Sequence, residues 1–259
     1  MTAPATSENS RDDEVVDALA TRVAGNGVAG ASDTAEPRTR VDGSTGQVDP
    51  AVTDLLGVLA YAELTAFGRL AHDARLAPTL ADQAALASMA VAEFGHFRRL
   101  QGRLQELGLD PDVAMAPFVA ALDAFHDSTA PRDWLEGLVK AYVGDGIAAD
   151  FYREVASYVD APTRDLVREV LADTGHAAFA VERVRAAIRA EPAVAGRLAL
   201  WARRLMGEAL LSAQRVAIDR DALARLIVGG RGDLAEVGRL LARLTDAHAQ
   251  RMASLGLSA

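Results

Sequence analysis

Two acid-x-x-His motifs are the residues of this chain whose types and spacing best suit chemistry. Glu93 and His96 form the first motif and Asp173 and His176 the second, and the motifs lie 80 residues apart. Residues at positions i and i+3 of an α-helix share one face. One carboxylate and one imidazole can therefore reach the same metal ion from a single helical turn.

Each motif is preceded by a further carboxylate at nearly the same distance. Glu63 lies 30 residues before Glu93, and Asp145 lies 28 residues before Asp173. A carboxylate from one helix and an acid-x-x-His from the next, used twice, is the ligand set of a di-iron or di-manganese centre inside a four-helix bundle. We therefore predict six metal ligands: Glu63, Glu93, His96, Asp145, Asp173 and His176.

The composition narrows the classes of site that the chain can build. It has 259 residues, of which 50% are hydrophobic, and no cysteine. That excludes disulfides, thiolate zinc sites, iron–sulfur clusters and cysteine nucleophiles. Carboxylate and imidazole ligands suit iron, manganese or zinc.

The charge is distributed unevenly along the chain. The formal net charge is −9, and residues 1–50 hold nine acids and four arginines, a net of −5, which leaves −4 for the remaining 209 residues. This balance gives no support for broad nucleic-acid binding. It is the balance of an ordinary solvated surface.

We expect two regions: a disordered tail over residues 1–48 and a helical domain over residues 49–259. Residues 1–48 are rich in small and acidic residues and show no recurring apolar face. The first residues have neither a basic nor an apolar segment of a secretory signal, and no run of about 18 apolar residues suggests a membrane span. We therefore expect a cytoplasmic protein that does not enter a membrane.

From Asp49 onward the pattern predicts helices and no strand. The expected ranges are 51–76, 80–107, a short helix near 112–126, 132–159, 163–189, 194–219 and 233–253. Short turns near residues 78 and 161 make two antiparallel hairpins, which the longer segment 109–131 joins. Two hairpins with one long crossover are the ferritin-like topology. The expected fold is therefore an all-α, ferritin-like four-helix bundle with two additional C-terminal helices.

All six candidate ligands fall on the apolar seams of their predicted helices. Steps of three and four residues connect them to neighbours such as Leu59, Met89 and Val170, and this spacing marks the inward face. Burying four carboxylates without partners is very costly, and two divalent ions would neutralise them. The competing interpretation is a metal-free structural bundle that keeps these groups as a buried polar network.

The fourth carboxylate has a rival. Asp150 also lies in the third long helix, but it stands one position off the seam. We favour Asp145 because it keeps the helical period.

The segments YAELTAFGRLA, ASMAVAEFGHFRRL, KAYVGDGIAADFYREVA and VLADTGHAAFAV resemble those of the ferritin-like di-iron carboxylate superfamily. More narrowly, the chain resembles the bacterial proteins grouped with the tRNA 2-methylthio-isopentenyl-adenosine hydroxylase. The superfamily's ligand pattern carries over to the six residues above, with aspartate at 145 and 173 where the family usually has glutamate. Aspartate is one methylene shorter and bridges metals less flexibly.

The resemblance implies a non-haem di-iron monooxygenase or hydroxylase. Two iron ions, with manganese as the alternative metal, would bind dioxygen between Glu93 and Asp173, with an external electron donor and a prenylated adenosine of tRNA as substrate. Two other functions stay open: a ferritin-like protein that handles iron or detoxifies peroxide, and the metal-free structural bundle. The sequence does not give the oligomeric state.

Overall fold

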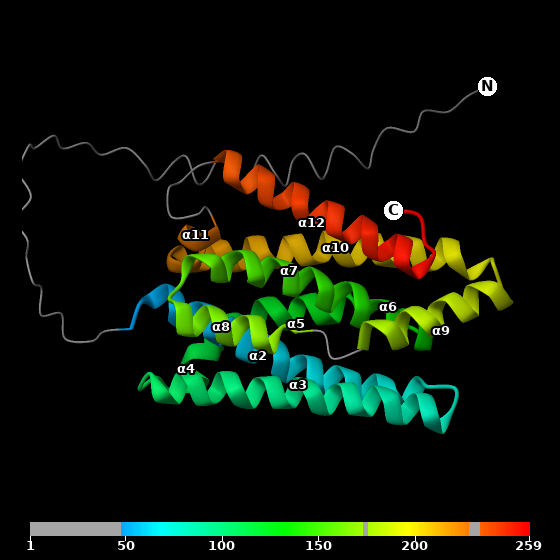
Figure 1. Cartoon of the computed structure of the whole chain (residues 1–259), viewed down its shortest axis with the longest axis horizontal. Helices are drawn as coiled ribbons and strands as arrows, with labels where there is room; N and C mark the ends of the chain where they lie inside the picture. Colours follow the sequence, from blue (N-terminus) through cyan, green and yellow to red (C-terminus); the bar gives the residue numbers. More distant parts are fainter. Residues whose placement is uncertain (1–47, 173–175, 228–233) are drawn as a thin grey trace, which may run out of the picture.

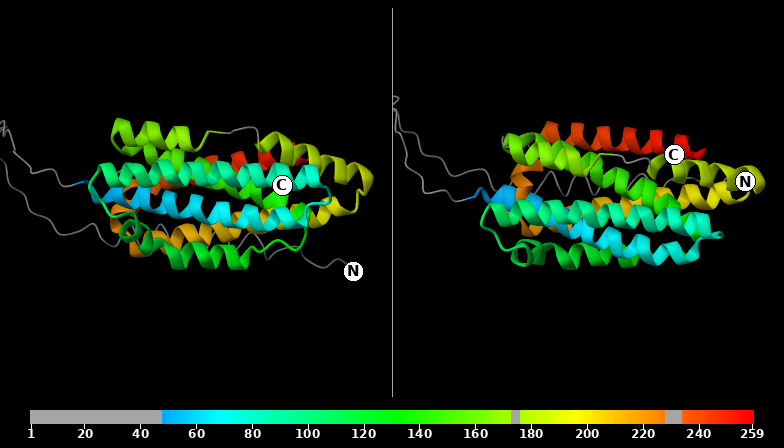
Figure 2. Two further views of the ribbon diagram at one scale, coloured as in Figure 1. Left: turned by 90° about the horizontal axis from the view of Figure 1, so that it is seen from below. Right: turned by 60° about the horizontal axis from the view of Figure 1, so that its bottom comes forward.

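The computed structural model describes residues 48–172, 176–227 and 234–259, and in these ranges every regular element is a helix. The expected all-α fold is therefore confirmed. The helices run largely along the long axis of the molecule, with α3 and α12 on opposite sides (Figures 1 and 2). The predicted tail over residues 1–48 falls almost wholly outside the described residues, and Asp173 also lies outside them.

The first hairpin consists of α2 (Pro50–Asp73), a 3₁₀ turn η1 (Ala74–Leu76) and α3 (Leu80–Glu106). Its ends follow local chemistry. The side chain of Asp49 accepts from Ala51 N at the start of α2, and that of Thr79 accepts from Asp82 N at the start of α3. After α3, Gly108 has φ 74°, a conformation that glycine adopts without strain. These two helices place Glu63 and Glu93 side by side.

The crossover is helical for most of its length. It contains α4 (Pro111–Met115), η2 (Ala116–Phe118) and α5 (Val119–Ser128). Gly57 of α2 lets the backbone of α4 approach closely, because a Cβ built at Gly57 would lie 2.2 Å from the carbonyl oxygen of Ala114. The crossover thus packs directly against the backbone of α2, and any side chain at residue 57 would clash with α4.

The third long helix contains an irregular turn just before Asp145. It runs through α6 (Trp134–Val139), a π-helical turn η3 (Lys140–Gly144), α7 (Asp145–Val155) and a final 3₁₀ turn η4 (Ala156–Tyr158). Single π-helical turns inside α-helices occur often at functional sites. Here the turn spans the residues that set the direction of Asp145.

The fourth long helix differs from the prediction. Residues 163–189 were expected to be one helix, but α8 (Ala161–Val170) ends at Val170, and Leu171 and Ala172 are not helical. The next described helix is α9 (His176–Ala190). Asp173 lies outside the described residues, so its expected place on one helical turn with His176 stays a prediction.

The C-terminal helices cover the bundle. They are α10 (Val194–Asp219), α11 (Asp221–Ile227) and α12 (Leu234–Leu255), and the sequence had not indicated α11. Ion pairs and hydrogen bonds hold α10 against the rest. Trp201 Nε1 donates to Glu136 O at 3.0 Å, and the guanidinium of Arg220 binds the carboxylate of Asp54.

Two apolar cores fill the bundle, one toward each end. Leu70, Leu86, Leu138 and Leu205 belong to one core, whereas Leu55, Leu100, Phe118 and Val155 belong to the other. Two of the predicted ligands lie between them in sequence: Glu63 falls between Leu59 of the second core and Leu70 of the first, and Glu93 between Ala90 of the first and Phe97 of the second. The bundle therefore carries a polar layer between two hydrophobic ones.

The segment Pro50–Leu76 is long and apolar enough to cross a membrane by length and hydropathy alone, and it is the one such helix in the described part of the chain. Within the fold, 56% of its most apolar window is buried. Its hydropathy is accounted for by its central place in the bundle.

Candidate metal centre

Glu63, Glu93 and His96 converge on one point. One ligand atom from each lies within 4.8 Å of the other two. His96 Nδ1 is 3.4 Å from Glu63 Oε2 and 3.3 Å from Glu93 Oε2. The first acid-x-x-His motif therefore meets the carboxylate of the preceding helix as the sequence predicts.

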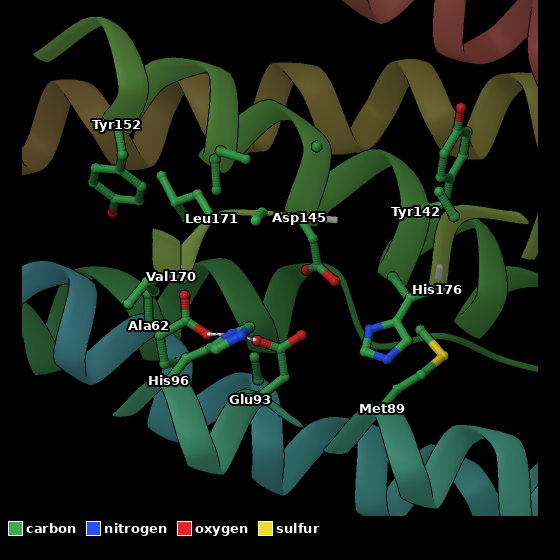
Figure 3. A pocket seen from close by; sticks show the side chains of 18 of the residues that line it. Ala62, Met89, Glu93, His96, Tyr142, Asp145, Tyr152, Val170, Leu171 and His176 are labelled. Atoms are coloured by element: carbon green, nitrogen blue, oxygen red, sulfur yellow. Dashed lines mark hydrogen bonds and ion pairs between the residues drawn. The ribbon is translucent and has the colours of Figure 1, made fainter. Parts of the chain in front are cut away.

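Asp145 and His176 face the same cavity from the other half of the bundle. Both line a space of about 370 Å³ together with Glu63, Glu93 and His96. In Figure 3, Asp145 projects from α7 toward Glu93, and the ring of His176 lies across the same space. Asp145 is exposed rather than buried, and because it lines this cavity, the surface that it exposes belongs to the cavity within the protein. Five of the six predicted ligands border one cavity, and the sixth, Asp173, lies outside the described residues.

The cluster holds three carboxylates, Glu63, Glu93 and Asp145, close to one imidazole, His96, and this shifts the pKa values of its members. Burial, together with the neighbouring Glu93, raises the pKa of Glu63 well above its usual range. Burial, with the charge of Glu93, likewise raises the pKa of Asp145. Hydrogen bonds to Glu63 and Glu93 raise the pKa of His96 to about 9. Burial alone would raise the pKa of Glu93, but its contacts with His96 and Glu63 outweigh burial and lower it.

A divalent metal ion fits Glu63, Glu93 and His96. Glu63 is only 7% exposed, and its buried Oε2 makes no well-formed hydrogen bond, with His96 Nδ1 3.4 Å away. A buried, unsatisfied carboxylate oxygen is costly, and a cation between Glu63, Glu93 and His96 would satisfy it. The donor set of carboxylate and imidazole is one that iron and manganese accept.

Asp150 has different partners from Asp145. Its carboxylate receives Arg153 Nη1 at 3.3 Å and also binds the guanidinium of Arg251. It is not among the residues that line the cavity, whereas Asp145 is. The geometry therefore favours Asp145 as the fourth carboxylate.

The comparisons with known proteins agree with this architecture. Residues 46–230 match a family model described as the ferritin-like domain of actinomycetes. This chain belongs to that family. The ferritin-like chain is also similar to a solved structure described as "Protein 19 with aldehyde deformylating oxidase activity from Synechococcus". The identity is 23% and the TM-score 0.61, over 81% of this chain and 91% of that one. At this identity the similarity shows the fold. No protein of curated function matches the chain.

A second, mostly apolar cavity of about 170 Å³, which His126 and Lys140 also line, adjoins the centre of this ferritin-like domain. The two cavities share Ala62, Ala66, Asp145, Ala148 and Tyr152 as lining residues. Side chains such as Val216, Leu223 and Leu244 line the second cavity farther from the centre. An apolar group in this space would lie beside Asp145.

Several residues at these cavities escaped the sequence analysis. Tyr152 lines both cavities, and burial, followed by the charge of Glu63, raises its pKa. Lys140 is the chain's single lysine. It is buried, donates to Thr129 O at 2.7 Å, and burial lowers its pKa to about 8. Neither residue belongs to a motif, so only the fold brings them to the site.

Tyr142 and Glu208 are polar residues that do not face the carboxylates of the centre. Tyr142 lines the larger cavity, but in Figure 3 its hydroxyl points away from the carboxylates. Glu208 accepts from Ser128 Oγ at 3.0 Å and thereby connects α10 to α5. Glu208 is a contact between helices.

Proposed function

We propose that this protein holds two iron ions with Glu63, Glu93, His96, Asp145, Asp173 and His176 and uses dioxygen to oxidise an apolar group of its substrate. The observation that carries the proposal is the pair of adjoining cavities. One is lined by five of the candidate ligands, and the other is mostly apolar, with Asp145 and Tyr152 at their boundary. A protein that only stores iron has no evident use for an apolar cavity at its metal site.

The chain's residues would divide the work. Glu63, Glu93 and His96 would hold the metal ions from one half of the bundle and Asp145, Asp173 and His176 from the other, with Glu93 and Asp173 as the catalytic carboxylates. The two irons, when bound, supply the electrons that reduce dioxygen. In a hydroxylation one oxygen atom enters a C–H bond and the other leaves as water, so two electrons and two protons must come from an external donor.

The substrate would place a hydrocarbon group in the apolar cavity. The prenylated adenosine of tRNA, which the sequence resemblance implies, carries a five-carbon isopentenyl group of suitable polarity. An aliphatic aldehyde, the class named for the Synechococcus structure, is the second candidate, since its chain has the same polarity. We propose that the reaction takes place in the cytoplasm, where both tRNA and cellular electron donors occur.

The first experiment is metal analysis of the native protein, followed by anaerobic titration with ferrous iron. We expect two irons per chain in the parent protein and loss of metal in Glu93→Ala. Glu136→Gln is the matched control, because Glu136 is also a buried glutamate but binds Arg197 away from the cavity. Equal metal content in parent and Glu93→Ala would refute the centre.

The second experiment separates the functions. The iron-loaded protein is given dioxygen and a reductant together with isopentenyl-adenosine tRNA, with a long-chain aldehyde, or with no substrate. A hydroxylated nucleoside or a shortened hydrocarbon identifies the substrate class. Rapid oxidation and accumulation of many irons per chain, without any organic product, would instead establish iron handling.

A further inference from the structure

Arg251 of α12 stands at the wall of the larger cavity with much of its hydrogen-bonding capacity unused. A guanidinium carries five N–H donors. Among the described residues, Arg251 contacts one acceptor, Asp150, through Nη2, and its Nη1 is buried without any partner. Its side chain is only 16% exposed. A buried, incompletely satisfied cation is costly unless a further acceptor completes it.

The charge around Arg251 is unbalanced in the direction of an anion. Arg153 and Arg251 both line the cavity, and both bind the same carboxylate, Asp150. Two positive charges against one negative leave a net of +1 among these three side chains. Glu63, Glu93 and Asp145 also line the cavity, and their negative charge is the part that bound metal ions would neutralise. A single carboxylate would neutralise the net charge of the Arg153, Arg251 and Asp150 group, whereas a phosphate ester would bring more negative charge than this group can balance.

Gly146 shows that the place of Arg251 is built into the fold. A Cβ built at Gly146 would lie 2.2 Å from Arg251 Nε and 2.7 Å from its Cζ. The guanidinium thus packs directly on the backbone next to Asp145, in space that only a glycine leaves open. Moreover, α12 lies beyond residues 46–230, the stretch that the family model matches.

We propose that Arg251, assisted by Arg153, binds the carboxylate of an organic acid whose hydrocarbon part lies toward the metal centre. This inference rests on the proposed function for its idea of a substrate, but it concerns binding and needs no oxidation to be tested. It deepens the substrate class from an apolar molecule to an apolar monocarboxylate. α12 thereby becomes a specificity element as well as a cover for the bundle.

The test is calorimetric titration of the metal-loaded protein with octanoate, with 1-octanol of the same chain length, and with octyl phosphate. We expect octanoate to bind most tightly. Arg251→Gln should weaken octanoate binding about 10- to 100-fold, the range for loss of a hydrogen bond to a charged group, and should leave 1-octanol unchanged. Gly146→Ala, which displaces the guanidinium but removes no charge, should weaken octanoate in the same way.

Two further variants test the sign and the specificity of the effect on octanoate affinity. Asp150→Asn removes the competing carboxylate and should tighten octanoate binding. Arg243→Gln is the matched control, because Arg243 also connects α12 to α7, through Glu154 at 2.9 Å, but does not line the cavity. It should leave the affinity unchanged. If Arg251→Gln does not fold, the opposite effects of Asp150→Asn and Gly146→Ala still decide the question.

Several results would overturn the assignment. Equal affinity for octanoate and 1-octanol would show that no cationic side chain binds the carboxylate of the ligand. Tighter binding of octyl phosphate would replace the carboxylate with a phosphate. Loss of binding in Arg243→Gln to the same extent as in Arg251→Gln would make the effect one of packing. Failure of the oxidase assays with normal octanoate selectivity would reject the proposed function and leave this site intact.

Discussion

Replacing Glu63 with glutamine should stabilise the metal-free protein and weaken the metal-bound one. Glu63 is 7% exposed, and its Oε2 is buried without a hydrogen-bond partner. Removing that desolvated charge while keeping the shape of the side chain should raise the free energy of unfolding of the apoprotein by about 1–3 kcal/mol. For a domain of this size that corresponds to an increase of about 2–12 °C in the unfolding midpoint.

The effect of metal should have the opposite sign. A ligand at a hundred times its Kd stabilises the folded state by about 2.7 kcal/mol. Because Glu63→Gln removes an anionic ligand, it should lose most of that gain. Thermal unfolding of both proteins, with a chelator and with ferrous iron under anaerobic conditions, measures both terms. Glu136→Gln is the control, since Glu136 accepts from Arg132 N at 2.8 Å and Arg197 Nη1 at 2.6 Å and should destabilise the apoprotein when changed.

The pH dependence gives the same reasoning a second check. The folded-state pKa of Glu63 lies above its unfolded value, so the folded apoprotein holds the proton more tightly. The tighter proton binding by Glu63 contributes to the free energy of unfolding. This contribution is complete below pH 4.5 and is lost as the pH rises through the raised pKa. The stability of the parent apoprotein should therefore fall toward alkaline pH more steeply than that of Glu63→Gln. A less stable apo variant with an unchanged response to iron would refute the argument.

Three further predictions follow from other residues. His96→Ala should lose more ferrous-iron affinity in anaerobic titration than His176→Ala, since His96 contacts two carboxylates at 3.4 and 3.3 Å; equal loss would contradict this asymmetry. Burial lowers the pKa of His126 to about 3, so the parent should lose stability as the pH falls below 6.5, and His126→Gln should spare about 1–2 kcal/mol of that loss at pH 5, measured by urea unfolding at pH 7 and 5. Gly57→Ala places a Cβ 2.2 Å from the carbonyl oxygen of Ala114 and should cost at least about 1–3 kcal/mol, whereas Gly102→Ala, which meets nothing within 4 Å, should not destabilise.

The sequence predicts well wherever local chemistry and helical period act together. The expected helix 194–219 coincides with α10, and the expected ends of α3 follow from Thr79 and Gly108. Glu63, Glu93 and His96 lie on regular helices, so the three- and four-residue spacing was enough to bring their side chains together. At these three positions the helical period and the packing of the helices both direct the side chain toward the interior of the bundle.

The prediction is weaker where long-range packing decides. The break at Leu171 and Ala172 was missed because the apolar spacing continues across it. The π-helical turn has no mark in the sequence, since it differs from an α-helical turn only in hydrogen bonding. Arg251 and Lys140 reach the cavities through tertiary structure, and nothing in their neighbouring residues indicates it.

The π-helical turn at Lys140–Gly144 has a consequence for how such a site can change during evolution. A π-helical turn holds about one residue more than the α-helical turn it replaces, and one residue corresponds to about 100° of rotation in an α-helix. Because the wider turn absorbs that residue, deleting a single codon within it should let α6 and α7 merge into a regular helix while Asp145 and the residues after it keep nearly their present orientation. The apolar contacts of the two cores would then stay in place, and the residues inside the turn, among them Ala141 and Tyr142 of the cavity wall, would change direction. One in-frame event could thus reshape the wall of this cavity without abandoning the bundle.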